Sequence, residues 1–478
     1  MSRATASSRI DGNLLALQFD GPTTFDAWLE AIARAEHFVH FENYILRDDP
    51  IGRQFREALI ERAENGVEVR VLYDWVGCWA TPRRYWRPFR AAGVEVRAFN
   101  RPGIGDPLGV FQRGHRKLVV VDGETAFLGG FCVGQEWAGT DDEPPWRDTG
   151  VEIRGPAAAA AAQTFERVWA ESGGTIPEAV SADPERTTPR GEVPVWLIEG
   201  QPWRSRVYRA TQLMASWARQ RLWITDPYFL APRPVAESLM AAARDGVDVR
   251  ILVPAHNNWP WVGSLSRGGF RSLLEAGVRI FEWQGPMIHA KTSVVDGQWC
   301  RIGSTNLNSA SLLGNWELDV GVLDPDLASQ VQALFLADLA SAVEIVLPGR
   351  APAADLDLAG PGLGTATLDR EPILSSSSAR PRGWTHSGQT LTIADIVRAG
   401  SALSDAIAGQ RVLGREDRVV LWTAAILLVL VGALAAFFPR TVGWTIAILF
   451  GWIGLTLGLR AAVQARRARA EAARDEPH

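Results

Sequence analysis

The spacing of apolar and polar positions predicts helices that lead into buried strands. Residues 51–64 and 236–243 carry apolar side chains at helical spacing, and each segment is followed by an Asn-Gly or Asp-Gly break and a β-branched run. Further along, two strands end in the Asp-Gly turns at 122–123 and 296–297, with a short return strand behind each. Helices that alternate with strands in this way favour an α/β fold.

Three segments occur twice and in the same order, which indicates a duplicated unit. The pairs are GVEVRVLYD at 66–74 with GVDVRILVP at 246–254, AAGVEVRAFN at 91–100 with EAGVRIFEW at 275–283, and HRKLVVVDG at 115–123 with HAKTSVVDG at 289–297. Each half then closes with a strand (149–154 and 318–322), a proline and a helix. We therefore expect two similar lobes, each a mixed β-sheet flanked by helices, related by a pseudo-twofold axis.

The composition between and after the repeats sets the expected boundaries. We place the first lobe at residues 12–175 and the second at 190–347, joined by a segment rich in Gly, Pro, Ser and Thr at 173–192. Residues 349–389, which include the run SSSS, are expected to form a flexible linker.

Two uncharged apolar stretches, 419–438 and 441–459, follow that linker. Each has about the 20 residues that a helix needs to cross roughly 30 Å of hydrocarbon, so residues 419–459 are predicted to form two transmembrane helices. A buried helix pair in a soluble protein is the alternative, although such helices usually keep a polar face. Arginines flank the pair on both outer sides, and the positive-inside rule then places the lobes on the cytoplasmic side of a bacterial inner membrane.

Composition narrows the classes of function. The chain has 478 residues, a formal net charge of −5 and a pI of about 5.9, which argues against a general nucleic-acid binder. Three scattered cysteines are too few for a disulfide framework. The first residues lack an apolar segment, so no signal peptide is expected.

The candidate chemistry lies in the repeated strands. A single shift in numbering carries His115, Lys117 and Asp122 onto His289, Lys291 and Asp296, respectively. Residues two apart on a strand share a face, so each histidine projects beside its lysine. One such pair alone would be an ordinary core or surface feature, but its duplication predicts two pairs that meet across one cleft.

A phosphodiester in that cleft would find the groups that its cleavage needs. One imidazole can attack phosphorus, and the other can protonate the leaving alkoxide and then activate the incoming hydroxyl. Two ammonium groups can neutralise the phosphate oxygens, so no metal or other cofactor is expected.

These residues resemble the HxKxxxxD signature of the phospholipase D superfamily, present twice. The phrases FENYILRDDPIG (41–52), PWRDTGVEIRGPA (145–157), TDPYFL (225–230) and NWELD (315–319) are similar to bacterial cardiolipin synthases. The resemblance implies that His115 is the nucleophile and His289 the general acid and base. It also implies that Lys117, Lys291 and Asn306 bind phosphate and that Asp148 and Glu317 support the histidines.

Three points remain open within this resemblance. Asp122 and Asp296 end their strands and are interpreted as architectural as much as catalytic. Cys132 stands where the pattern often has Asn, which makes the halves unequal. The apolar spans lie at the C-terminus, whereas many similar cardiolipin synthases carry them at the N-terminus.

Three functions are considered. The first is a phosphatidyltransferase that converts two phosphatidylglycerol molecules into cardiolipin and glycerol; the second is a phospholipase D that uses water as the acceptor. A nuclease or an inactive membrane scaffold is the third. The expected partners are phospholipids and a membrane, with no nucleic acid, and protein partners are left open.

Overall fold

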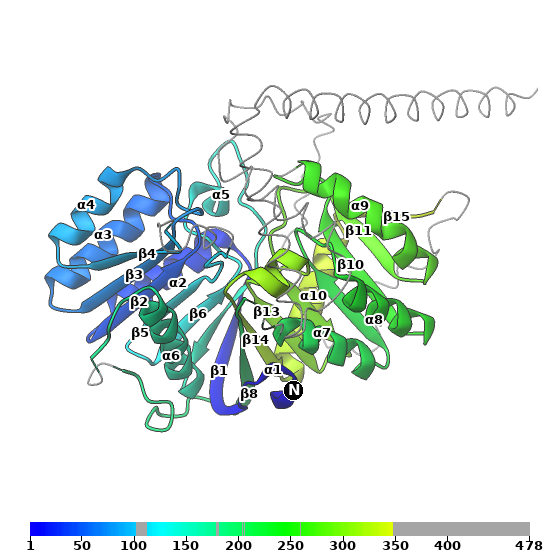
Figure 1. The fold of residues 1–478 in the computed structure, drawn as a ribbon, viewed down its shortest axis with the longest axis horizontal. Helices are drawn as coiled ribbons and strands as arrows, with labels where there is room; N and C mark the ends of the chain where they lie inside the picture. Colours follow the sequence, from blue (N-terminus) through cyan, green and yellow to red (C-terminus); the bar gives the residue numbers. More distant parts are fainter. Residues whose placement is uncertain (102–111, 178–180, 203, 205, 259, 348–478) are drawn as a thin grey trace, which may run out of the picture. The chain divides into compact units, whose positions relative to one another are not determined.

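The structure, a computed structural model, describes residues 1–101, 112–177, 181–202, 204, 206–258 and 260–347. Its strands form one continuous sheet in the order β15-β11-β10-β9-β12-β13-β14-β8-β1-β7-β6-β5-β2-β3-β4. Read outward from the central pair β1 and β8, the order of equivalent strands is the same on both sides (Figure 1). The predicted pair of similar α/β lobes is therefore confirmed.

The first lobe contains strands β1 to β7 and helices on both faces of its part of the sheet (Figure 1). Its strands are β1 Ile10–Gln18, β2 Phe38–Asn43, β3 Glu68–Asp74, β4 Glu95–Phe99, β5 Leu118–Val121, β6 Thr125–Gly129 and β7 Gly150–Arg154. Its helices are α1 Ser2–Thr5, α2 Gly21–Ala33, α3 Pro50–Glu64, α4 Arg87–Ala91, α5 Gln135–Ala138 and α6 Pro156–Glu171. Strands β2, β3 and β4 are parallel, and β5, β6, β7 and β1 continue the sheet in antiparallel pairs.

The second lobe repeats this plan with one extra strand at its edge. Its strands are β8 Val193–Gly200, β9 Arg221–Thr225, β10 Asp248–Pro254, β11 Arg279–Trp283, β12 Thr292–Val295, β13 Trp299–Gly303, β14 Glu317–Leu323 and β15 Ala342–Ile345. Its helices are α7 Arg206–Trp217, α8 Arg233–Arg244, α9 Pro260–Glu275 and α10 Pro325–Leu339. The expected helix–strand pairs are thus present, with helix ends that differ from the expected ones by a few residues.

Local sequence explains where the helices begin. Asp49 precedes α3 and Asp324 precedes α10, and each carboxylate accepts a backbone N–H of the first helical turn, from Gly52 at 2.8 Å and from Leu327 at 2.7 Å. A proline follows each cap, where its missing N–H costs nothing.

A common hydrophobic core joins the two lobes. Helix α6 of the first lobe and helix α10 of the second contribute Phe165, Trp169 and Phe335 to one buried cluster that also includes residues of β5, β8 and β14. Alanines on α6 let that helix approach the sheet closely. Because this core belongs to both lobes, it holds their facing strand ends in one arrangement.

Among the residues that the structure describes, no helix is both long and apolar enough to cross a membrane. The predicted transmembrane helices at 419–459 and the predicted linker at 349–389 lie outside the described residues.

Candidate active site

The segments that lead into β5 and β12 each cross to the other lobe. Gly114 forms an isolated parallel bridge with Trp316, and Ile288 forms one with Arg147. The next residue in each segment is a motif histidine. The backbone N–H of His115 donates to the Trp316 carbonyl at 2.9 Å, and that of His289 donates to the Arg147 carbonyl at 2.7 Å.

Each histidine ring is held by a carboxylate of the opposite lobe. His115 Nδ1 lies 3.0 Å from Glu317 Oε2, and His289 Nδ1 lies 2.7 Å from Asp148 Oδ2. An N–H at Nδ1 that donates to a carboxylate leaves the Nε2 lone pair for chemistry, as in the triads of acyl-transfer enzymes. The structure thus brings the four predicted residues together as two pairs that cross between lobes.

The two carboxylates are themselves fixed by neighbours. Glu317 accepts from the Ser304 hydroxyl at 2.6 Å and from Asn315 Nδ2 at 3.2 Å. Asp148 accepts from the indole N–H of Trp137 at 2.8 Å. Both carboxylates are fully buried, so these bonds replace the water that an ionised carboxylate would otherwise require.

The motif lysines are also buried, and each stands next to a tyrosine ring. Each Nζ donates to the backbone carbonyl of the histidine two residues earlier. Lys117 Nζ lies 5.0 Å from the centre of the Tyr44 ring, and Lys291 Nζ lies 6.0 Å from that of Tyr228, within reach of a cation–π contact. Neither lysine has a salt-bridge partner among the described residues, so both ammonium groups keep donors for a bound anion.

Burial dominates the electrostatics of the histidines. It lowers the pKa of His115 to about 4 and that of His289 to about 3, even though the paired carboxylates oppose the shift. The charge of Lys291 also lowers the pKa of His115, and that of Lys117 lowers the pKa of His289, so the two motifs are close enough to interact. Both imidazoles are therefore neutral near pH 7 when no anion is bound.

The pKa values of two neighbouring groups, Asp148 and Lys291, are lowered as well. Burial alone would raise the pKa of Asp148, but its electrostatic interaction and hydrogen bond with His289 lower that pKa to about 2. Burial and the charge of Lys117 lower the pKa of Lys291 to about 8, against the effect of Asp148. A bound phosphate would stabilise the charged forms of the histidines and lysines, because it adds a negative charge beside them.

Asp122 and Asp296 lie at the other ends of their strands. At about 3.3 Å per residue of strand, Asp122 is roughly 15 Å or more from Lys117. Asp122 accepts the backbone N–H groups of residues 36–38, and Asp296 accepts those of residues 219–221, all at 2.8–2.9 Å. Each aspartate thus ties the start of β2 or β9 to the turn that follows β5 or β12, which supports the architectural interpretation of both.

Asn306 and Cys132 occupy equivalent positions after β13 and β6. The amide nitrogen of Asn306 is held only loosely, at 3.4 Å from the Ser311 hydroxyl, and its oxygen is buried without a hydrogen-bond partner among the described residues. Cys132 is buried, and burial raises its pKa. The second lobe therefore offers an amide where the first offers a neutral thiol.

The role of the tyrosines was missed at the sequence level. The ring centre of Tyr44 lies 4.7 Å from that of His115, and the ring centre of Tyr228 lies 6.0 Å from that of His289, both in edge-on geometry. Each tyrosine follows the strand beside the motif strand, β2 or β9. The signal was present in the phrases FENY and DPY, which put a tyrosine two or three residues after the last paired residue of that strand in both halves.

Comparison with known proteins agrees with this geometry. A family model described as "Cardiolipin synthase, PLD-like domain" matches residues 28–169 and 212–339. Cardiolipin synthase A of Pseudomonas aeruginosa (strain LESB58) is 34% identical over 347 residues, which cover 72% of this chain and 70% of that protein. The cardiolipin synthase of Halalkalibacterium halodurans is 35% identical over 328 residues, covering 67% of this chain and 65% of the relative.

The fold is shared more widely. The crystal structure of phosphatidylserine synthase from Haemophilus influenzae Rd KW20 matches 69% of this chain and 87% of its own with a TM-score of 0.56, at 14% identity. That likeness concerns the fold alone. The family model and the relatives at about 35% identity go further, and the chain belongs to the cardiolipin synthase family of phospholipase D-like proteins.

Proposed function

We propose that this protein is a phosphatidyltransferase that makes cardiolipin and glycerol from two molecules of phosphatidylglycerol. The observation that carries the proposal is the pair of imidazoles, each held at Nδ1 by a buried carboxylate of the other lobe. Membership of the cardiolipin synthase family supports the choice of substrate and reaction.

In the first step, Nε2 of His115 attacks the phosphorus of one phosphatidylglycerol. A P–N bond forms and the P–O bond to the glycerol headgroup breaks. His289, protonated on Nε2, gives that proton to the departing glycerol oxygen, so glycerol leaves as a neutral alcohol. His115 then carries the phosphatidyl group, and Glu317 stabilises the positive charge on its ring.

In the second step, a hydroxyl of another phosphatidylglycerol attacks the same phosphorus. His289 Nε2 takes the hydroxyl proton, a new P–O bond forms and the P–N bond breaks. The product is cardiolipin, and both histidines return to their starting protonation states. Asp148 favours the protonated form of His289 that the next cycle requires.

We assign the phosphate ligands to Lys117, Lys291 and Asn306. The two ammonium groups can neutralise the non-bridging oxygens, and the loosely held amide of Asn306 can donate a further bond. The phosphate diester brings one negative charge into a site with two buried cations. This charge favours the single imidazolium that the first step needs, although burial disfavours it in the empty cleft.

We further propose that residues 12–175 and 190–347 are the two catalytic lobes and that residues 419–459 anchor them to the cytoplasmic face of a bacterial inner membrane. The apolar pattern of 419–459 and the flanking arginines support the anchor. An anchor would keep the cleft at the surface where both lipid substrates reside.

Lipid mass spectrometry tests the reaction after expression in a bacterial strain that lacks its own cardiolipin synthases. We expect cardiolipin to appear with the wild-type chain and to be absent with His115→Ala or His289→Ala produced at equal levels. Purified protein on phosphatidylglycerol vesicles gives the second readout. Phosphatidic acid as the sole product would identify a hydrolase and reject the transferase.

A further inference from the structure

A pocket of about 840 Å³ lies in the first lobe along the edge strand β4 and the carboxyl-terminal end of β3, and its lining continues into the segment that follows β3. None of the motif histidines and lysines lines it, so it is separate from the candidate active site. Ligands of α/β proteins commonly bind outside the carboxyl ends of strands, and a volume of this size suits a small ligand or headgroup.

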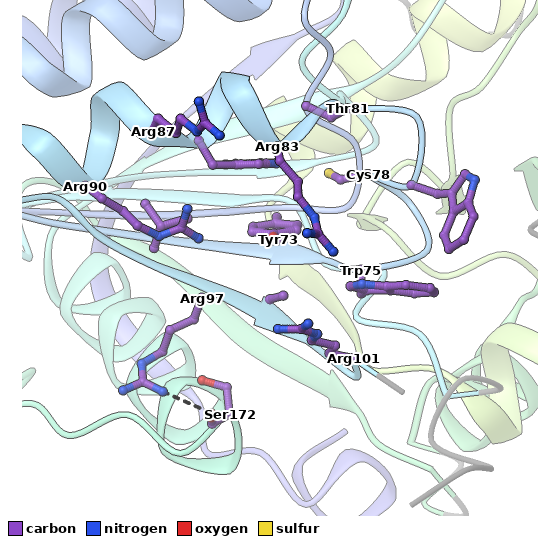
Figure 2. Close-up of a pocket in the computed structure, with 14 residues that line it drawn as sticks. Tyr73, Trp75, Cys78, Thr81, Arg83, Arg87, Arg90, Arg97, Arg101 and Ser172 are labelled. Carbon is purple, nitrogen blue, oxygen red and sulfur yellow. Dashed lines mark hydrogen bonds between the residues drawn. The ribbon is translucent and has the colours of Figure 1, made fainter. Parts of the chain in front are cut away.

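The pocket is rich in positive charge. Its lining contains no aspartate or glutamate. It contains five arginines, which are Arg83, Arg87, Arg90, Arg97 and Arg101 (Figure 2). Most other arginines of the described chain form salt bridges, but none of these five is joined to a carboxylate within the described residues. Unpaired guanidinium groups of one sign would attract an anion into this pocket in a chain that is acidic overall.

Figure 2 shows the side chains of Arg83, Arg90 and Arg101 around the ring of Tyr73. The electrostatics agree: burial raises the pKa of Tyr73, and the charges of Arg90 and Arg101 oppose that rise. Arg97 donates to the carbonyl of Ser172 at 3.2 Å, which fixes it at the other side of the pocket.

Aromatic rings form the remaining wall. Tyr73 stacks on Trp86 with ring centres 3.9 Å apart, and Trp75 meets Trp79 edge-on at 4.8 Å. Trp79 is 43% exposed, an unusual state for a tryptophan. Exposed tryptophans beside arginines are typical of surfaces that meet the headgroup region of a membrane.

We propose that this pocket binds the phosphate headgroup of an anionic phospholipid. Guanidinium groups bind phosphate oxygens in a bidentate manner, and the tryptophans can contact the glycerol backbone and the first part of the acyl chains. The proposal takes the class of lipid from the proposed function but concerns a second binding place, outside the histidine pair.

The second lobe does not repeat two of the pocket residues. In the repeated strands, Val253 of β10 corresponds to Tyr73, and Phe281 of β11 corresponds to Arg97. These two positions are therefore apolar in the second lobe. The fold that the lobes share does not require a tyrosine and an arginine there, which argues for a binding role of Tyr73 and Arg97 over a structural one.

The pocket wall also adjoins the active site. Trp75 follows Asp74, whose carboxylate accepts the backbone N–H of Gly114 at 2.9 Å, directly before His115. Cys78, in the same wall, contacts the carbonyl of Tyr44, the ring that stands against His115. A lipid bound in the pocket would thus lie one layer of residues from the proposed nucleophile.

The test measures lipid binding by the full-length chain in neutral detergent micelles, with His115→Ala present to prevent turnover. Phosphatidylglycerol with brominated acyl chains is added, and quenching of tryptophan fluorescence reports binding. A parallel titration of the Trp79→Phe chain isolates the pocket signal. The pocket variant is R83Q/R87Q/R90Q, and the matched control is R209Q/R219Q/R244Q, which removes three exposed arginines of the second lobe.

We expect the half-saturating mole fraction of lipid to rise by about fivefold or more in the pocket variant and to stay near the wild-type value in the control. Equal behaviour of the two triple variants, with circular dichroism and thermal unfolding unchanged, would overturn the proposal. Brominated phosphatidylcholine, which has no net charge, is the control lipid and should quench the tryptophan fluorescence weakly and equally in all chains. If it binds tightly and the pocket variant weakens that binding, the pocket does not require an anionic lipid.

Two further arms separate the remaining outcomes. Inorganic phosphate in large excess should leave the quenching by lipid largely intact, because the apolar contacts remain; full displacement would make this a site for a soluble phosphate and overturn the lipid assignment. Trp79→Ala should weaken lipid binding even if the triple variant folds poorly. If the wild-type chain makes no cardiolipin, the proposed function is rejected. The pocket proposal is judged separately, by the lipid-binding measurement.

Discussion

At the scale of single residues, the important feature is that each histidine depends on a carboxylate of the other lobe. Glu317 lies against His115 and Asp148 against His289, both fully buried. A carboxylate in this position fixes the tautomer and stabilises the imidazolium, so its amide replacement leaves the ring present but wrongly protonated. Loss of Glu317 should therefore impair the proposed nucleophile, whereas loss of Asp148 should impair the proposed general acid and base.

Glu317→Gln and Asp148→Asn are each expected to lower kcat by about 10²- to 10⁴-fold, with a smaller effect on KM. The steps can be separated with a phosphatidyl ester of p-nitrophenol, whose departure needs no acid. Asp148→Asn and His289→Ala should then regain a burst of p-nitrophenol, whereas Glu317→Gln and His115→Ala should not. The reverse pattern would make His289 the nucleophile.

A second prediction at this scale concerns His40 in β2. Its ring stacks on Phe165 with centres 4.4 Å apart, and both ring nitrogens are buried without partners among the described residues. Burial and the charge of Arg70 lower the pKa of His40 to about 3. The unfolded chain binds a proton near pH 6.5 and the folded chain does not, so this group removes stability as the pH falls below about 6.5.

His40→Phe keeps the ring stack and removes the proton uptake. Between pH 7 and pH 5, we expect the wild type to lose about 2 kcal/mol more stability than the variant. Thermal or urea unfolding of the two chains at both pH values measures the difference. His115 and His289, whose pKa values are also lowered by burial, should add to the acid sensitivity that both chains share. Identical pH dependence would show that His40 is not buried in its neutral form.

At the scale of secondary-structure elements, Asp122 and Asp296 show how a motif residue can act through the backbone. Each adopts a left-handed conformation, with φ of 53° and 51°, and each accepts three backbone N–H groups at the start of a neighbouring strand. An αL residue that ends a tight turn is usually Gly, Asn or Asp. These carboxylates thus hold β2 on β5 and β9 on β12.

Asp122→Ala and Asp296→Ala should each destabilise the fold by about 1–3 kcal/mol, because three backbone N–H groups, one of them partly buried, lose their acceptor. The matched Asn variants should cost less, since Asn tolerates the αL conformation and keeps one oxygen. In both cases kcat per folded molecule should change little. A thousandfold loss of kcat in a variant that unfolds like the wild type would instead establish a direct role in the chemistry.

At the scale of the whole molecule, the continuous sheet brings the two histidine–carboxylate pairs together from two lobes of the same chain. Strands β1 and β8 pair at the centre, and α6 and α10 share one core, so the facing strand ends are held in register. The buried ion pair between Arg147 of the first lobe and Asp338 of the second, at 2.9 Å, adds a further link beside the histidine segments. One molecule contains every group that the proposed reaction uses.

A mixture of full-length His115→Ala and His289→Ala chains should therefore remain inactive. Each chain lacks one histidine of its single site, and a second chain cannot supply it while the lobes stay joined. Co-expression of the two variants, followed by lipid mass spectrometry, makes this measurement. Recovery of a substantial fraction of wild-type activity would show that lobes are exchanged between chains and that the site forms in a dimer.

The sequence by itself determined the duplication, the α/β class and the identity of the motif residues. These features are local: periodic side chains select helix or strand, an Asp-Gly pair selects a turn, and spacing by two residues puts His115 and Lys117 on one face. The repeat made the assignment specific, because the same pattern occurs around His289 and Lys291.

Only the tertiary structure decided which residues meet. The crossing of Glu317 to His115 and of Asp148 to His289, the tyrosines beside the lysines and the arginine pocket all depend on contacts between segments far apart in the chain. No local pattern encodes such contacts, since they follow from how the two lobes share a sheet and a core. The same reason separates Asp122 from Lys117: they belong to one motif, but the strand between them carries their side chains to opposite ends.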